Sequence, residues 1–176
     1  MPKVNCCGAD MGYNVKIQRL ELNAMIDLQG DAEAIRNWVK DDDLPDFPDK
    51  PNTSSANQKF KLYWIGIEHW LLRSEIGLED RLLEMTNPST APIEISLVQV
   101  SDAFKFFEVI GPDAPEIISI ASPIDHHLSV FPENGVSYTN IFGIKGLLIR
   151  VSNGFEIAVE SSYADLMSDF LQRANA

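Results

Sequence analysis

Cysteines, basic residues and long apolar runs are all scarce in this 176-residue sequence. Cys6 and Cys7 are adjacent, and the chain has no third cysteine that could pair with either of them. Adjacent cysteines rarely bridge one another, and a two-cysteine metal site needs His or carboxylate ligands close by. We therefore expect a reduced pair in a flexible tail over residues 1–13, as in a reducing cytosol.

The scarcity of long apolar segments limits where the protein can work. No stretch approaches the roughly 20 apolar residues that a transmembrane helix needs. Residues 1–7 contain no apolar stretch typical of a signal peptide. The expected location is therefore the cytoplasm, without membrane contact.

The shortage of basic residues excludes another class of partner. Lys and Arg number 14 against 26 Asp and Glu, which leaves a formal net charge of −12. A protein that binds nucleic acid needs a basic surface to displace counterions from phosphates, and an anionic membrane makes a similar demand. We expect no nucleic-acid partner, and a basic protein surface suits this chain better.

Motifs that carry known chemistry are missing as well. His69, His126 and His127 are the only histidines, and they show neither the i, i+4 spacing nor the clustering of a metal site. The nucleophile elbow G-x-S-x-G is absent, as are the G-x-G-x-x-G and G-x-x-x-x-G-K-[ST] phosphate loops. The sequence predicts no catalytic, metal-binding or cofactor-binding residue on this chain.

Hydrophobic periodicity predicts an α+β fold with mixed or antiparallel sheets. Alternating segments typical of strands occupy residues 20–28, 59–72, 93–97, 104–110, 136–142, 147–151 and 155–160. Helical spacing occurs at residues 32–39, 78–85, 114–121 and 163–171. We expect Asp31 to cap the first helix and Ser161 or Ser162 to cap the last.

Loops are predicted where Pro, Gly and like charges gather. Residues 41–58 form an acidic, proline-containing segment that lacks the central Gly and terminal Glu of a calcium loop. Residues 143–146 and 152–154 are expected to be tight hairpin turns. Residues 14–176 then form one domain, which two small lobes, 14–90 and 91–176, could share.

One internal similarity has two interpretations. Residues 28–32 and 109–114 both show an apolar strand end, then Gly, Asp and Ala, then a helix. Many strand-to-helix turns look alike, so the similarity can be local. It can also reflect two related α+β halves, and the sequence leaves both interpretations open.

The second half of the chain resembles a known family through four elements in a set order. They are Val100-Ser101-Asp102, Gly111-Pro112-Asp113-Ala114, Ser122-Pro123-Ile124-Asp125-His126-His127 and Phe131-Pro132. This order resembles the gamma subunit of heterotetrameric sarcosine oxidase, in which Cys and Leu usually stand where Ser122 and Ile124 stand here. The resemblance is best over 97–176, weaker over 59–73, and limited over 15–40 to the strand–Gly–Asp–helix pattern.

That family is in turn distantly similar to the folate-binding aminomethyltransferases of glycine cleavage (T-proteins). Those enzymes carry a Gly-Gly-x-x-Asp-Asp element in a hairpin that resembles residues 138–151, and its carboxylate acts at the folate. This chain has Lys145-Gly146-Leu147-Leu148-Ile149-Arg150 there. The resemblance thus implies that the fold is kept without the folate chemistry.

The resemblance implies a non-catalytic role in a cytoplasmic complex. Its partners would be the alpha, beta and delta subunits of an enzyme that oxidatively demethylates sarcosine to glycine. FAD, FMN, NAD, tetrahydrofolate and zinc are expected on those partners, and no cofactor on this chain. Two alternatives remain: a free-standing folate-binding aminomethyltransferase-like protein, or an interaction module of another flavoprotein dehydrogenase.

The apolar content of two segments predicts where such partners dock. Large apolar residues follow one another at 63–72 and 104–107, so both faces of a strand must be covered. The chain's own helices can cover one face. We expect a partner to cover the other, with Trp64, Trp70, Leu72, Phe104 and Phe107 as contacts. A two-layer domain whose helices cover both sets is the alternative.

Overall fold

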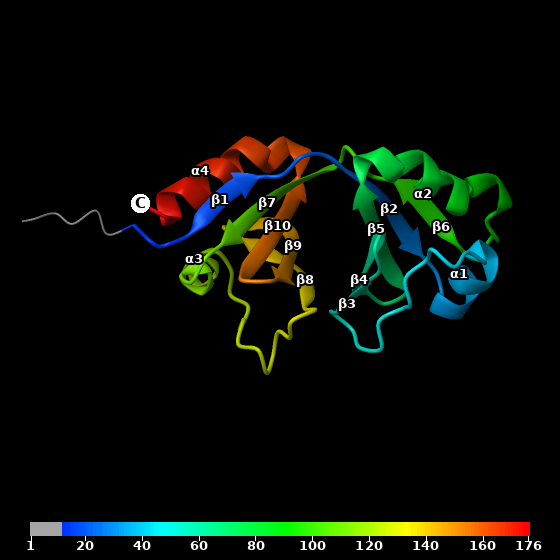
Figure 1. Ribbon diagram of the computed structural model, residues 1–176, viewed down its shortest axis with the longest axis horizontal. Helices are drawn as coiled ribbons and strands as arrows, with labels where there is room; N and C mark the ends of the chain where they lie inside the picture. Colours follow the sequence, from blue (N-terminus) through cyan, green and yellow to red (C-terminus); the bar gives the residue numbers. More distant parts are fainter. Residues whose placement is uncertain (1–11) are drawn as a thin grey trace, which may run out of the picture.

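The structure is a computed structural model that describes residues 12–176. Cys6 and Cys7 therefore lie outside the described residues. Within them, two five-stranded sheets have the strand orders β1-β7-β10-β9-β8 and β3-β4-β5-β2-β6. Every strand pair in both sheets is antiparallel. The predicted α+β class with antiparallel sheets is confirmed (Figure 1).

The secondary-structure elements have the following bounds. The strands are β1 (Lys16–Arg19), β2 (Asn23–Gln29), β3 (Ser54–Ala56), β4 (Phe60–Gly66), β5 (His69–Glu75), β6 (Ser96–Gln99), β7 (Phe104–Ile110), β8 (Val136–Ile141), β9 (Ile144–Val151) and β10 (Gly154–Glu160). The helices are α1 (Ala32–Val39), α2 (Glu79–Met85), α3 (Ala114–Ala121) and α4 (Ala164–Ala174), with short 3-10 turns η1 (Ile76–Leu78), η2 (Pro88–Thr90) and η3 (Ser161–Tyr163).

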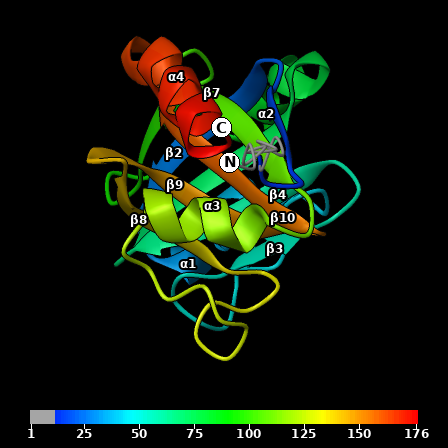
Figure 2. The same ribbon diagram turned by 90° about the vertical axis from the view of Figure 1, so that its left-hand side faces the viewer.

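The sheets lie in the middle of the molecule and the helices lie on its outer sides. One core packs α3 and α4 against the sheet of β7 and β10, and a second packs α1 and α2 against the sheet of β2 and β5. A third core joins the two sheets directly. Figure 2, viewed from the side of α3 and α4, shows these helices in front of their sheet. The result is a helix–sheet–sheet–helix arrangement.

The two halves of the chain repeat one order of elements and exchange their first strands. The first half runs β1-β2-α1-β3-β4-β5-α2 and the second β6-β7-α3-β8-β9-β10-α4. The sheet orders β3-β4-β5-β2-β6 and β8-β9-β10-β7-β1 then correspond strand by strand. Because β1 pairs with β7, and β6 with β2, each lobe in space takes one strand from the other half. The halves 14–90 and 91–176 are therefore structural repeats, but they are not the two spatial lobes.

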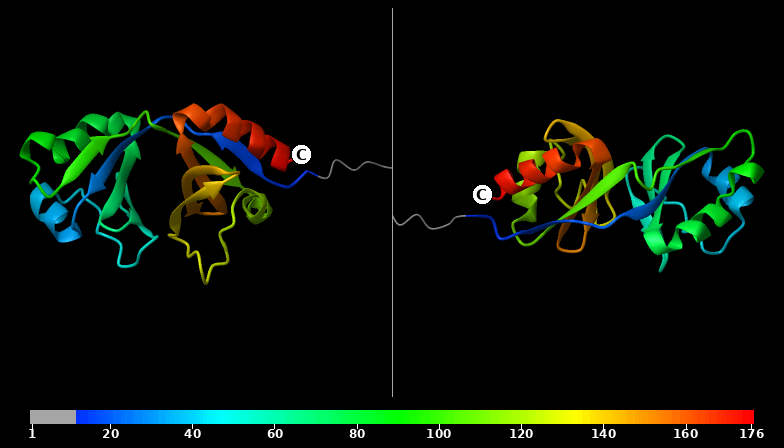
Figure 3. Two further views of the ribbon diagram at one scale, coloured as in Figure 1. Left: turned by 180° about the vertical axis from the view of Figure 1, so that it is seen from behind. Right: turned by 90° about the horizontal axis from the view of Figure 1, so that it is seen from above.

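Chain crossings and a short bridge connect the lobes. Residues 20–22 and 100–103 carry the chain from one sheet to the other, which the views from behind and above make visible (Figure 3). At the opposite edges, Thr53 pairs with Gly135 in an antiparallel bridge. The backbone N–H of Ser54 donates to the carbonyl of Asn134 at 2.8 Å beside it.

The repeated turn after β2 and β7 explains the similarity seen in the sequence. Gly30 and Gly111 have φ values of 149° and 147°, a backbone region that side chains disfavour. Asp31 caps α1 as predicted, because its carboxylate accepts from the N–H groups of Glu33 and Ala34. Asp113 instead accepts from the N–H of Asn14 at 2.8 Å, so it ties the entry of β1 to the start of α3.

Several local predictions differ from the structure. Strand β1 was not predicted, β3 lies within residues 41–58, which were predicted as a loop, and the strand predicted at 20–28 begins only at Asn23. The β8–β9 turn is the two residues Phe142 and Gly143, both with positive φ, and β9 begins at once after them. No serine side chain caps α4, because η3 precedes it and Ser161 donates its hydroxyl to the Asp102 carbonyl. Ile93, predicted in a strand, is fully exposed, since pairing with β2 starts only at Ser96.

Candidate functional site

The predicted contact residues divide between the cores and the surface. Trp70, Leu72 and Phe107 are 3%, 0% and 1% exposed, so the chain itself covers them and they cannot anchor a partner. The docking prediction is wrong for these three. Trp64 and Phe104 are half-buried, and for them it stays a prediction.

The second sheet covers the strand face that we expected a partner to cover. Strand β5 places Leu72 toward the helices and Leu71 toward the opposite sheet, as alternation requires. Both faces are thus filled without a partner. The side chains that meet between the sheets are Met25, Tyr63, Leu71, Phe106, Val136, Leu147, Ile149 and Ala158.

A buried ion pair crosses this apolar layer. Arg73 on β5 donates to the carboxylate of Glu156 on β10, and both side chains are 7% exposed. The same guanidinium donates to the Tyr63 hydroxyl at 3.2 Å and to the Asn23 amide oxygen at 3.0 Å. Its central carbon lies 3.9 Å from the ring centroid of Phe106, a cation–π contact. The charges of Arg73 and Glu156 compensate one another.

Burial changes the acidity of the tyrosine in this centre. The Tyr63 side chain loses solvation, and this raises its pKa to about 12 although the cation of Arg73 acts in the opposite direction. A tyrosine of this kind stays neutral at physiological pH. The contacts among Tyr63, Arg73 and Glu156 therefore hold the two sheets against one another.

The three histidines differ in their hydrogen-bond surroundings. His69 contacts the carboxylate of Asp27 through Nε2 at 2.9 Å, at the edge of the inter-sheet layer. His127 contacts the Ser129 hydroxyl at 2.8 Å, whereas Nδ1 of His126 is buried without a hydrogen-bond partner within residues 12–176. No group of three or more metal-binding side chains occurs in that part of the chain.

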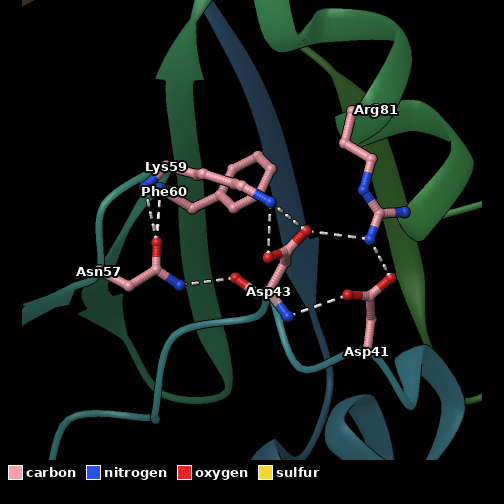
Figure 4. Close-up of polar contacts among 6 residues, drawn as sticks. All are labelled: Asp41, Asp43, Asn57, Lys59, Phe60 and Arg81. Atoms are coloured by element: carbon pink, nitrogen blue, oxygen red, sulfur yellow. Dashed lines mark hydrogen bonds and ion pairs between the residues drawn. The ribbon is translucent and has the colours of Figure 1, made fainter.

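The acidic segment predicted as a solvated loop is held in place by cations (Figure 4). Asp43 accepts from Lys59 at 2.9 Å and from Arg81 at 3.1 Å, and Arg81 also contacts Asp41 at 2.6 Å. The side chain of Asn57 donates to the Asp43 carbonyl at 2.7 Å. The hydrogen bonds from Lys59 and then Arg81 lower the pKa of Asp43 below its ordinary value. These contacts join the loop to β4 and α2.

A hollow lies beside α3. Its volume is about 790 Å³, within the range of small-molecule sites. Residues from the start of α3, the β9–β10 turn and the loop after α3 line it, including Arg150 and Glu133. Arg150, like Arg73 and Glu156, was not singled out from the sequence. The available signal was a charged residue inside an otherwise apolar strand.

Strand β9 carries no acidic side chain. Leu147, Leu148 and Ile149 are buried, and the strand Ile144–Val151 contributes only Lys145 and Arg150 as charged side chains. Its apolar residues fill the cores on both faces of the sheet.

Comparison with known proteins finds likeness in structure and none in sequence. No family model matches the chain, and no curated protein does. A chain of heterotetrameric sarcosine oxidase from Corynebacterium sp. U-96 superposes with a TM-score of 0.75 at 18% identity, over 91% of this chain and 83% of that one. Aminomethyltransferase T of the glycine cleavage system from Bartonella henselae superposes with a TM-score of 0.66 at 14% identity, over 90% of this chain but 45% of that one.

These likenesses concern the fold. At such identities two proteins can share an architecture and differ in function. Within residues 12–176, no helix has the length and apolarity needed to cross a bilayer. The chain has a fold like those of a sarcosine oxidase chain and of aminomethyltransferase T.

Proposed function

We propose that this chain is a non-catalytic, gamma-type subunit of a cytoplasmic heterotetrameric sarcosine oxidase that converts sarcosine oxidatively to glycine. The observation that carries the proposal is the superposition on a chain of such an enzyme over nearly the full length of both. The aminomethyltransferase match covers less than half of its chain, so it supports a shared fold without a shared complete enzyme.

The chemistry of the polar groups supports an assembly role. The buried Arg73–Glu156 pair lies between the sheets, and the Asp43 network holds a loop. Neither places a free nucleophile or base beside a cavity. On this proposal FAD, FMN, NAD, tetrahydrofolate and zinc are held by the alpha, beta and delta subunits.

The surface still offers apolar contacts for a partner. Ile67, at the β4–β5 turn, is 94% exposed, and Trp64, three residues earlier in the sequence, is half-buried. Exposed apolar residues next to an aromatic side chain suit the centre of a protein interface. We place the docking contact at this turn, in place of the buried part of 63–72.

Affinity purification of the tagged chain from its native host tests the proposal. We expect three further chains in constant proportion, flavin absorbance, and sarcosine-dependent oxygen consumption by the purified complex. Mass spectrometry then identifies the chains. Recovery of this chain alone, or with proteins that hold no flavin, would contradict the subunit role. A complex that contains flavin but ignores sarcosine would favour another flavoprotein dehydrogenase.

The folate-binding alternative has one supporting observation, the fold it shares with aminomethyltransferase T. Calorimetric titration of the purified chain with a reduced folate separates it from the proposal. Because strand β9 carries Leu147, Leu148 and Ile149 in place of a carboxylate, we expect no heat of binding. Micromolar affinity for the folate would instead favour the enzyme.

A further inference from the structure

The hollow beside α3 contains an arginine that the fold holds in one orientation. Nε of Arg150 donates to the Phe131 carbonyl at 3.0 Å, and Nη2 donates to the His126 carbonyl. The guanidinium carbon lies 4.7 Å from the ring centroid of Phe155 and 5.5 Å from that of Phe131. Within residues 12–176, Nη1 has no hydrogen-bond partner. Three of the five N–H donors of a fixed guanidinium, two of them on Nη1, therefore remain available.

The charge of Arg150 is unusual for this chain. The other arginines each lie within 3.2 Å of a carboxylate: Arg19, Arg36, Arg73, Arg81 and Arg173. Within the described range Arg150 alone has none, although 26 acidic residues are present in the sequence. Loss of solvation lowers its pKa, with only the more distant charge of Glu133 acting against this. A cation in that position favours an anion supplied from outside the chain.

The lining of the hollow limits which anion fits. Pro112, Pro115 and Leu128 give it apolar walls beside the guanidinium. Glu133 lines the same hollow, and its negative charge would repel a ligand that carries two charges. The volume of about 790 Å³ admits a small molecule.

We infer that this hollow binds a small organic monocarboxylate, with one carboxylate oxygen accepting from Nη1 of Arg150 and the apolar part on Pro112 and Leu128. Glu133 acts as the selectivity residue, because it disfavours dicarboxylates. The site goes beyond the proposed assembly role, and it requires neither a partner subunit nor a flavin.

Ligand-observed NMR titration of the full-length purified chain tests the site with propionate, its neutral isostere propionamide, and the dicarboxylate malonate. We expect saturable propionate binding, and affinities at least tenfold weaker for propionamide and malonate, since a charge-assisted hydrogen bond is worth about this factor. Equal binding of propionate and propionamide, or no propionate binding at tens of millimolar, would overturn the inference.

Two variants and a control assign the effect to the side chains. Arg150→Gln should weaken propionate binding at least tenfold, whereas Arg173→Gln, which removes an exposed arginine on α4, should leave it unchanged. Arg150 also donates to two backbone carbonyls, so Arg150→Gln could fail to fold. In that case the exposed Glu133→Gln substitution tests the site. This variant should still bind propionate, and it should bind malonate with similar affinity. Unchanged discrimination in that variant would overturn the inference.

Discussion

Arg73 and Glu156 are 83 residues apart in the sequence and form an ion pair in the space between the two sheets. Strand β5 supplies the arginine and strand β10 supplies the glutamate, and these strands occupy corresponding central positions in the two sheets. The pair therefore depends on the correct packing of one repeat on the other.

Removing one partner of this pair should destabilise the chain strongly. In Arg73→Met the carboxylate of Glu156 would stay buried without a counter-charge, which costs about 3–5 kcal/mol in the free energy of unfolding. The double variant Arg73→Met/Glu156→Leu should recover most of that loss. Urea denaturation measures both, and Arg173→Met is the control at an exposed pair. Equal stabilities of the single and double variants would contradict this account.

Alkaline pH should weaken the folded state through Tyr63. Its pKa is raised from 10.0 to about 12, so the unfolded chain loses the phenolic proton first as pH rises. The stability that protonated Tyr63 contributes is fully present below pH 10 and is lost as pH rises through the folded-state pKa. The free energy of unfolding should fall by about 2–3 kcal/mol over this range. The measurement is urea denaturation of the wild type and Tyr63→Phe across this range.

The phenylalanine variant supplies the reference for this titration. At neutral pH Tyr63→Phe should be less stable by about 1 kcal/mol, because Arg73 loses a hydrogen bond. Above pH 10 the wild type should lose stability faster than the variant, so that the difference shrinks and then reverses. Parallel pH profiles for the two proteins would exclude Tyr63 as the titrating group.

Substitutions at Trp70 and Ile67 should distinguish a loss of folding from a loss of assembly. Trp70 is 3% exposed, donates to the Gly30 carbonyl at 3.1 Å and contacts the ring of Phe47, so Trp70→Glu should unfold the isolated chain. Ile67→Glu, at a 94% exposed position, should change the free energy of unfolding by less than about 0.5 kcal/mol. Thermal unfolding measures the first effect, and co-purification with partner chains measures the loss of assembly expected for Ile67→Glu.

The Asp43 network should protect its loop down to unusually low pH. The hydrogen bonds from Lys59 and Arg81 lower the Asp43 pKa, so the contacts persist as pH falls through the ordinary carboxylate range and are lost only when pH falls through the lowered value. Protection factors for hydrogen exchange of residues 41–53 should thus be as high at pH 4 as at pH 7 in the wild type. Asp43→Asn should speed exchange there at pH 7, whereas Asp42→Asn, a neighbouring substitution outside the network, should not.

Local sequence patterns predicted many of the elements. Apolar alternation over residues 104–110 corresponds to β7 residue for residue, and Asp31 caps α1 as its residue type predicts. The similarity between residues 28–32 and 109–114 corresponds to the same turn in two structural repeats. These features depend on neighbours within a few residues, which is why periodicity and capping rules reach them.

Sequence patterns alone predicted the four helices, the strands other than β1 and β3, and the two-sided apolar character of β4, β5 and β7. What covers each face became visible only in the folded chain, because a period of two residues identifies the faces of a strand without identifying the layer that packs on them. On one face that layer is a second sheet of the same chain, whereas on the other face the helices bury Phe107 and Trp70. The exchange of β1 and β6, the Arg73–Glu156 pair and the unpaired Arg150 follow from contacts between distant segments, which no local pattern contains.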